Sequence, residues 1–188
     1  KPAHAGKDPE NGINAIQVLA KAVSNMKLGR IDEETTANFG IISGGTAVNV
    51  VCANLKVRGE ARSTSEEKLN AQIEHMKEGF LNAGKEFGAE INIDYKRHYS
   101  AYYVPEDSPV VKVAQAASRK LGLEPTLRTT LGGSDANVYN NKGLTCIVVA
   151  TGMEHIHTHD ERISRKDLVL TAELALQLLI HSAELKDA

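Results

Sequence analysis

A run of ten residues in the first half of the chain alternates between two kinds of side chain. One set is apolar or small and the other is polar: Ala53, Leu55, Val57, Gly59 and Ala61, against Asn54, Lys56, Arg58, Glu60 and Arg62. Successive side chains of a strand point to opposite faces, so the pattern predicts a strand with one buried face. Such a strand needs a sheet partner and a covering layer, which limits the possible folds.

Helical spacing of apolar side chains predicts a helix on each side of this strand. The first begins at Asp8-Pro9-Glu10, where an N-cap candidate precedes Pro in the first turn, and it ends at Gly29. The second opens with the capping residues 63–67. The two apolar stripes are Ile13, Ile16, Leu19, Ala20, Val23 and Met26, then Leu69, Ile73, Met76, Phe80 and Phe87.

Further strands complete the first domain. Residues 35–42 read as a strand that leads through a Gly-Gly turn at 44–45 into the alternating run, and Ile91, Ile93 and Tyr95 alternate again. The residues before Asp8 could supply a first strand. The order is then β-α-β-β-α-β, a ferredoxin-like α+β domain with one antiparallel sheet and two helices on one face, which we expect over residues 1–102.

Residues 103–188 show a different order. Ser108-Pro109 begins a helix, residues 126–130 form a short strand, and Gly132-Gly-Ser-Asp-Ala136 leads into a short helix. The apolar run 144–150 predicts a buried strand, and residues 166–185 predict a long helix. Alternating helices and strands indicate part of an α/β sheet.

Composition excludes several classes of function. The formal net charge is −2, from 22 basic and 24 acidic residues, so we expect neither nucleic-acid binding nor binding to an anionic membrane. No apolar run approaches the ~20 residues of a membrane span. Cys52 and Cys146 lie in apolar, strand-like runs, which favours buried free thiols and a reducing cytoplasm.

Three histidines, His155, His157 and His159, are followed at once by Asp160 and Glu161. Imidazole and carboxylate are the usual ligands of zinc and similar cations. In an extended chain the three imidazoles would lie too far apart to bind one ion, so one would be the ligand and the others would lie around it or in solvent. The alternative is a polar surface turn.

Four other groups are candidates, each with a structural alternative. His4 could donate to a developing oxyanion, or it is a surface histidine. The turn Gly44-Gly-Thr-Ala-Val-Asn49 could place an amide against a ligand, or it is a hairpin connection. Arg62 could pair with a substrate carboxylate, or it is an exposed strand end. Residues 132–135, with Arg128 upstream, could hold an anion at a helix start, or Asp135 merely caps that helix.

Seven motifs occur in a fixed order: Pro2-Ala-His-Ala-Gly6 with residues 9–16, Gly29-Arg-Ile-Asp32, Glu34-Thr-Thr36, Gly44-Gly-Thr-Ala-Val-Asn-Val50, Glu60-Ala-Arg62, Gly132-Gly-Ser-Asp135 and His157-Thr-His-Asp-Glu161. In this order they resemble the second half of the co-catalytic two-zinc peptidases. That family includes peptidase T, carboxypeptidase G, aminoacylase and succinyl-diaminopimelate desuccinylase, and the resemblance is closest to the peptidase T-like branch.

The resemblance implies a role for each motif. His157 is similar to the family's last zinc ligand, and His4 to the lid histidine that steadies the tetrahedral intermediate in the partner subunit. Asn49 is similar to the lid asparagine that contacts substrate. Arg62 and the turn containing Gly133, Ser134 and Asp135 are similar to elements that bind substrate carboxylate or shape the site. The first domain would be the lid and dimerisation domain, and residues 103–188 the C-terminal part of the catalytic α/β domain.

The family's other metal ligands and its general base precede the lid, and no such motif occurs in this sequence. We therefore expect the chain to be a piece of a longer cytoplasmic enzyme, inactive by itself. The parent would be a homodimeric aminopeptidase that hydrolyses short peptides with two zinc ions per subunit, cobalt or manganese being other possible metals. Two alternatives are a deacylase or carboxypeptidase of the same family, and a stand-alone dimerisation or small-molecule-binding module.

Overall fold

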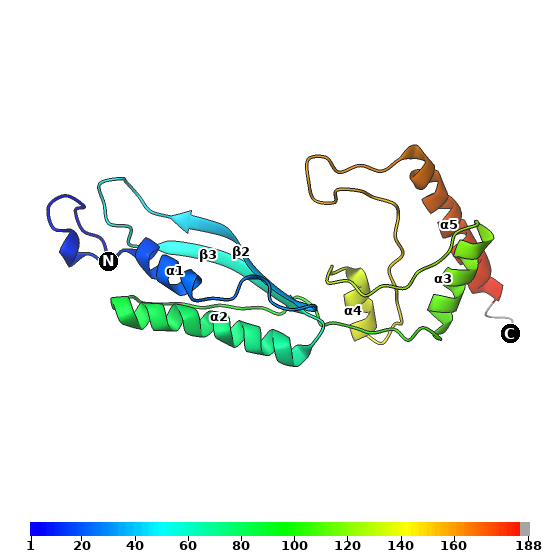
Figure 1. Ribbon diagram of the computed structural model, residues 1–188, viewed down its shortest axis with the longest axis horizontal. Helices are drawn as coiled ribbons and strands as arrows, with labels where there is room; N and C mark the ends of the chain where they lie inside the picture. The colour runs from blue at the N-terminus through cyan, green and yellow to red at the C-terminus, as the bar shows by residue number, and fades with distance from the viewer. Residues whose placement is uncertain (185–188) are drawn as a thin grey trace. The chain divides into compact units, whose positions relative to one another are not determined.

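The structure is a computed structural model, of which residues 1–184 are described (Figure 1). The chain divides into two compact units, Lys1–Ala101 and Tyr102–Ala188. The first contains a 3-10 turn η1 (Pro9–Asn11), helices α1 (Ala15–Ser24) and α2 (Glu66–Phe87), and strands β1 (Gly29–Arg30), β2 (Thr35–Gly44) and β3 (Leu55–Ser63). The second contains helices α3 (Pro109–Lys120), α4 (Asp135–Asn141) and α5 (Arg165–Glu184).

The sheet of the first unit has three antiparallel strands in the order β1-β2-β3. The long β2–β3 ladder runs from Thr35 opposite Ser63 to Gly44 opposite Leu55, with an irregularity between Phe39 and Ile41. Residues 45–54 form a loop between these strands, so the Gly-Gly pair does not make the tight hairpin turn that the sequence suggested. The short strand β1 pairs with β2 only through its two residues.

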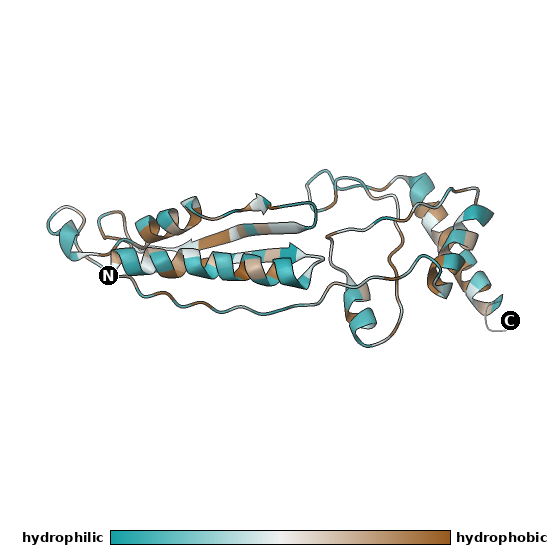
Figure 2. Ribbon diagram, turned by 60° about the horizontal axis from the view of Figure 1, so that its bottom comes forward, coloured by the Kyte–Doolittle hydropathy of each residue, from teal (hydrophilic) through white to brown (hydrophobic). Residues whose placement is uncertain are grey.

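The core of the first unit lies between its two helices and the sheet. Val18 and Ala22 of α1 pack with Ala83 of α2, and all three are buried. The ring of Phe39 on β2 meets that of Phe80 on α2 edge to face, with centroids 5.5 Å apart. Figure 2 shows hydrophobic and hydrophilic residues alternating along both helices, as expected for helices with one buried face.

Helix α1 begins later than the sequence suggested. The predicted start at Asp8-Pro9-Glu10 forms only the separate 3-10 turn, and α1 begins after Asn14, whose side chain accepts the N–H of Ile16. The helix ends at Ser24, and Gly29 instead starts β1. The prediction for α2 is confirmed, since Ser65 caps its first turn.

The prediction of a mixed α/β protein with a small antiparallel sheet beside two helices is confirmed. The first and last strands of the predicted β-α-β-β-α-β order are not formed. The N-terminal residues contribute one isolated antiparallel bridge, between His4 and Val50. Residues 91–95 run alongside α2 without pairing to the sheet in the described part of the chain. A strand needs a neighbouring strand for its backbone groups, and neither segment has one here.

The second unit is built on the packing of α3 against α5. Val111, Val113 and Ala117 of α3 and Leu174 of α5 are buried. The predicted strands 126–130 and 144–150 are wrong: within residues 102–184 the structure contains no strand, and the side chains of Leu144 and Val148 are 61% and 59% exposed. The helix predicted over 166–185 is confirmed as α5, although Leu185 lies outside the described residues.

One side-chain amide fixes the chain after α4. Asn140 donates from Nδ2 to the carbonyls of Ala136 (2.8 Å) and Cys146 (2.7 Å), and its Oδ1 accepts the N–H of Cys146 at 3.2 Å. Cys146 is half-buried, Cys52 is buried, and both are free thiols that lie outside strands. Among the described helices, none is long and apolar enough to cross a membrane.

Candidate functional site

The first candidate group lies at one end of the first unit, where the N-terminal residues meet the β2–β3 loop. His4 forms its antiparallel bridge with Val50, and the N–H of Ala5 donates to the carbonyl of Asn49 at 3.0 Å. Both His4 and Asn49 are exposed. The structure therefore brings together two residues that the sequence singled out separately.

The ring of His4 is held in one orientation by its own loop. Its Nδ1 accepts the N–H of Gly6 at 3.1 Å, and its backbone N–H donates to Oδ1 of Asp8 at 3.1 Å. Because Nδ1 accepts, the proton of the neutral ring lies on Nε2. An exposed imidazole N–H of this kind can donate to an oxyanion. Asp8 was interpreted from sequence only as a helix cap, so its part in fixing this loop was missed.

Arg62 lies at the opposite end of β3. Its Nε and Nη2 donate to the two carboxylate oxygens of Glu60, each at 3.0 Å. This hydrogen bonding raises the pKa of the Arg62 guanidinium above its ordinary value. The Arg62 side chain is still 38% exposed. About 23 Å of strand separates Leu55 from Arg62 at a rise of ~3.3 Å per residue, so Arg62 and His4 lie far apart.

The turn before α4 is arranged by a capping box. The hydroxyl of Ser134 accepts the N–H of Ala136, and Oδ1 of Asn137 accepts the N–H of Ser134 at 3.0 Å. The capping residue is therefore Ser134 and not Asp135, which is the exposed first residue of the helix. Gly133 and Ser134 are also exposed.

The histidine-rich stretch is a compact turn rather than an extended chain. Glu154 and Arg162 close it with an antiparallel bridge and an ion pair of 2.7 Å. His155 and His157 adopt left-handed backbone conformations, with φ of 52° and 67°, which cost a non-glycine residue roughly 1–2 kcal/mol each. The N–H of His157 donates to Glu161 Oε2 at 2.7 Å, which holds this carboxylate beside the turn.

The described residues do not build a metal site by themselves. No group of three or more His, Cys, Asp or Glu side chains in residues 1–184 is placed to hold a metal ion. All three histidines of the turn are exposed, and bending brings Glu161, rather than a second imidazole, to the backbone of His157. A metal would therefore need ligands beyond those that residues 1–184 gather.

Titratable side chains also gather in a network that the sequence analysis did not identify. Nζ of Lys68 on α2 lies 2.5 Å from Glu34 and 3.3 Å from Asp32, and Thr64 donates to Glu34 as well. The hydrogen bond from Lys68 lowers the pKa of Glu34, while the backbone N–H of Glu34 lowers the pKa of Asp32. These contacts tie the β1–β2 turn to the start of α2, which is a structural role.

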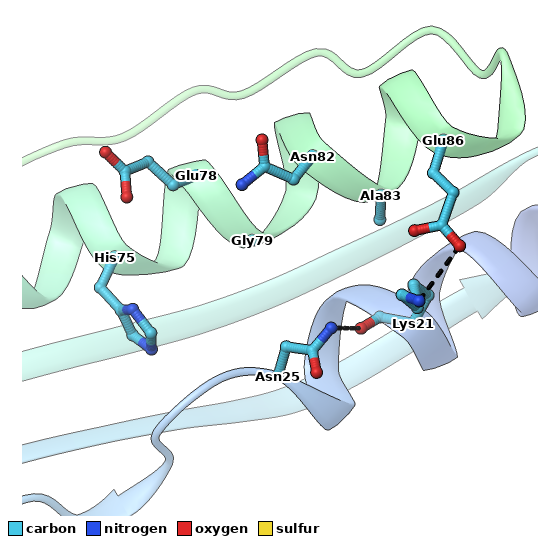
Figure 3. Close-up of a pocket in the computed structure, with 8 residues that line it drawn as sticks. All are labelled: Lys21, Asn25, His75, Glu78, Gly79, Asn82, Ala83 and Glu86. Carbon is cyan, nitrogen blue, oxygen red and sulfur yellow. Dashed lines mark hydrogen bonds and ion pairs between the residues drawn. The ribbon is translucent and has the colours of Figure 1, made fainter.

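A shallow hollow of about 170 Å³ lies between α1 and α2 (Figure 3). His75 lies at its edge, but Nε2 of this ring accepts the N–H of Lys27 at 3.0 Å. Lys21 and Glu86 pair across the hollow at 3.1 Å. The Lys21–Glu86 pair joins the two helices there, so we interpret the hollow as part of the contact between α1 and α2 and not as a second candidate site.

Comparison with known proteins relates the first unit to a described domain. Residues 1–87 match the family model of the peptidase dimerisation domain, M20_dimer. The YqjE protein of Bacillus subtilis is 41% identical over 184 residues, which cover 98% of this chain and 50% of that protein.

Two solved structures extend the similarity to nearly the whole chain. Aminopeptidase PepT of Bacillus cereus is 43% identical, with a TM-score of 0.80, over 97% of this chain and 49% of that one. A tripeptidase of Staphylococcus aureus is 38% identical, with a TM-score of 0.85, over 95% of this chain and 48% of that one. The chain thus spans about half the length of the relatives it matches.

More distant relatives are named for more than one reaction. They include peptidase T of Clostridium perfringens and succinyl-diaminopimelate desuccinylase of Helicobacter hepaticus. A Bacillus subtilis protein described as a dinuclear metal-binding peptidase from the M20 family shares the fold at 19% identity, with a TM-score of 0.63.

Proposed function

We propose that the chain is part of a zinc-dependent aminopeptidase acting on short peptides, because residues 1–87 match the peptidase dimerisation domain and nearly the whole chain is similar to aminopeptidase PepT and to a tripeptidase. Residues 1–102 are the lid, through which two subunits form a homodimer in the cytoplasm. Residues 103–188 are the C-terminal part of the catalytic domain.

The observation that carries this proposal is the position and protonation of His4. Its imidazole is exposed at the end of the lid, with Nδ1 engaged as an acceptor and the proton on Nε2. A donor fixed in this way stabilises the oxyanion that forms when water attacks a peptide carbonyl. Asn49, which is bonded to the residue after His4, contacts the same substrate.

His157 contributes one metal ligand in this proposal, and Glu161 keeps its turn in shape. The remaining ligands of the two metal ions come from outside the described residues, because no three His, Cys, Asp or Glu side chains within residues 1–184 are placed to hold a metal ion. Cobalt or manganese could replace zinc. Gly133, Ser134 and Asp135, at the start of α4, bind substrate carboxylate or shape the substrate site in this proposal.

Arg62 binds a substrate carboxylate, but not together with the His4 of its own subunit. A tripeptide extends over about 10 Å, whereas the two residues are separated by more than ~20 Å along β3. We therefore assign His4 and Arg62 of one lid to different active sites, with His4 serving that of the partner subunit.

The test uses the complete enzyme, with His4→Ala and Arg62→Ala made separately. His4→Ala lowers kcat about 100- to 1,000-fold without changing the metal content, whereas His98→Ala, another exposed histidine of the same unit, has no such effect. In a hybrid dimer of the two variants, one active site keeps both groups. Equal mixing then restores about a quarter of wild-type activity, since half of the dimers are hybrids.

If the His4→Ala variant kept full activity, His4 would not be the donor that stabilises the oxyanion. A verified hybrid with no recovered activity would mean that both residues serve the same active site.

A deacylase or carboxypeptidase reaction is the second candidate, and the desuccinylase relatives favour it. Both reactions use the same oxyanion donor, so His4→Ala does not separate them. Steady-state rates on a tripeptide with a free amino terminus and on its N-succinyl derivative do separate them, because an aminopeptidase requires the free amine.

A further inference from the structure

The turn that carries His157 keeps a backbone conformation that non-glycine residues do not favour. His155 and His157 both lie in the left-handed region, with φ of 52° and 67°. Such conformations persist only where the surrounding structure holds them. The ion pair of Glu154 with Arg162 closes the turn, but both partners belong to it, so other contacts have to fix the turn to the rest of the unit.

One side chain in the first turn of α5, Asp167, contacts the chain on both sides of this turn. Two residues after Arg162, Ser164 donates its hydroxyl to Oδ2 of Asp167 at 2.6 Å and accepts the N–H of Asp167 at 3.0 Å. Two residues before Glu154, Gly152 packs against the same side chain, since a Cβ added there would lie 2.8 Å from Cβ of Asp167 and 2.9 Å from its Cγ. Because Ser164 holds Asp167, this side chain has little freedom to move aside for a larger residue at position 152.

A second contact lies one turn further along α5. The hydroxyl of Thr171 lies 3.2 Å from the carbonyl oxygen of Thr151 and 2.8 Å from that of Asp167, four residues back in its own helix. Thr171 and Thr151 are both half-buried, so water competes less for this hydrogen bond than it would at an exposed site. Thr151 and Gly152 are therefore fixed together on α5.

We propose that Asp167 and Thr171 are positioning residues, which act through Gly152 and Thr151 to hold the His157 turn in one place on α5. The inference rests on the proposed function, in which His157 is a metal ligand. A ligand has to be held within about 0.5 Å of its productive position. Replacement of residues that orient metal ligands changes metal affinity about 10- to 100-fold.

The first test measures amide hydrogen exchange in the chain 1–188 and involves no activity. Thr171→Val removes the hydroxyl but keeps the shape of the side chain. The amides of His157 and Arg162 then exchange at least about fivefold faster, while that of Leu174, which is buried between α3 and α5, is unchanged. Thr171→Ser keeps the hydroxyl and leaves all three rates within about twofold of wild type.

Two outcomes of this test overturn the proposal. One is that Thr171→Val and wild type exchange equally fast at His157 and Arg162. The other is an equal acceleration at Leu174, because the substitution would then loosen the whole helix pair rather than the attachment of the turn.

A matched pair of glycines tests the contact with Asp167. Gly152 and Gly143 both have positive φ, 77° and 82°, but a Cβ at Gly143 would meet no atom within 4 Å. Alanine causes similar backbone strain at both positions, whereas only Gly152→Ala also forces the chain away from Asp167. The amides of His157 and Arg162 therefore exchange at least about tenfold faster in Gly152→Ala than in Gly143→Ala. Equal exchange in these two variants overturns the proposal.

Zinc affinity of the complete enzyme separates this inference from the proposed function. Thr171→Val raises the dissociation constant of zinc about tenfold, as measured by competition with a chelator, and Thr171→Ser restores the wild-type value. Unchanged zinc affinity in Thr171→Val, together with loss of zinc in His157→Ala, overturns the positioning role. If His157→Ala binds zinc as wild type does, the proposed function fails, and the exchange rates in the chain 1–188 alone decide whether α5 holds the turn.

Discussion

The two units of the chain use similar apolar content in different ways. In the first, two helices and a strand ladder bury Val18, Ala22 and Ala83 together. In the second, two helices pack on each other, while the apolar run 144–150 stays extended and largely exposed. Helices satisfy their backbone hydrogen bonds internally, but a strand depends on a neighbour. The first unit therefore contains most of the neighbouring segments on which its strands and helices pack. In the described residues of the second unit, no strand pairs with the apolar segment 144–150.

Amide exchange gives the largest expected difference between the units. In the chain 1–188, the amides of residues 147–149 exchange nearly as fast as in an unfolded peptide. Amides in the middle of α2, around Ile73 and Met76, exchange at least about a thousandfold more slowly, because they open only with the core of the first unit. Two-dimensional NMR after transfer to heavy water measures both. Similar amide exchange rates in residues 147–149 and in the middle of α2 would show that the two units do not differ in this way.

A matched pair of valines tests whether the two units differ in core packing. Val18 of α1 is 4% exposed, whereas Val169 of α5 is 59% exposed. Val18→Ala removes two buried methyl groups and lowers the free energy of unfolding by about 2 kcal/mol. Val169→Ala changes it by less than about 0.5 kcal/mol. Urea unfolding followed by circular dichroism measures both variants. An equal cost at the two positions would contradict the burial difference.

A glycine within α2 shows how closely the following segment packs on this helix. A Cβ added at Gly84 would lie 2.4 Å from Ile91 and 3.1 Å from the carbonyl of Ala89. Gly84→Ala therefore destabilises the first unit by about 1–2 kcal/mol, although alanine is the better helix former. The control is Gly79→Ala, where the nearest atom is the flexible end of Met26, which can move at lower cost. Thermal unfolding that shows Gly84→Ala to be stabilising would mean that residues 89–91 are not held against α2.

The smallest effect concerns the acidic turn before β2. Hydrogen bonding to Lys68 lowers the pKa of Glu34 in the folded state, so the stabilisation is present above the unfolded pKa of about 4.3 and is lost as pH falls through the lower folded value. Lys68→Met is therefore less stable than wild type at pH 7, and the difference shrinks toward pH 3. Lys112→Met, at an exposed position of α3, shows no such trend. Urea midpoints at the two pH values provide the test, and a difference that does not depend on pH would exclude the ion pair as its source.

The helices were predictable from the sequence because their signals are local. Apolar spacing and capping residues placed α2 and α5 nearly correctly, and Ser65 caps α2 as expected. The start of α1 was missed because Pro9 begins a separate 3-10 turn, while Asn14, which lies within the predicted helix next to Ile13, supplies the cap. The strands at 126–130 and 144–150 were predicted from composition alone, which says nothing about whether a neighbouring strand is present.

The candidate site was only partly predictable for the same reason. The sequence singled out His4 and Asn49 but not their proximity, which depends on a bridge between distant segments. It also left open whether the three histidines form an extended stretch or a surface turn, and the ion pair of Glu154 with Arg162 closes them into a turn. The roles of His4, Asn49, Arg62 and His157 stay predictions until the variants are measured.

Hydrolysis of the side-chain amide of Asn140 would disturb the second unit. Its nitrogen donates to two carbonyl oxygens at once, those of Ala136 and Cys146. Deamidation would exchange that nitrogen for a negatively charged oxygen, which would face both carbonyls with no proton to share. Conversion of Asn140 to aspartate, which raises the mass by about one dalton, would therefore loosen the chain after α4 from its helix.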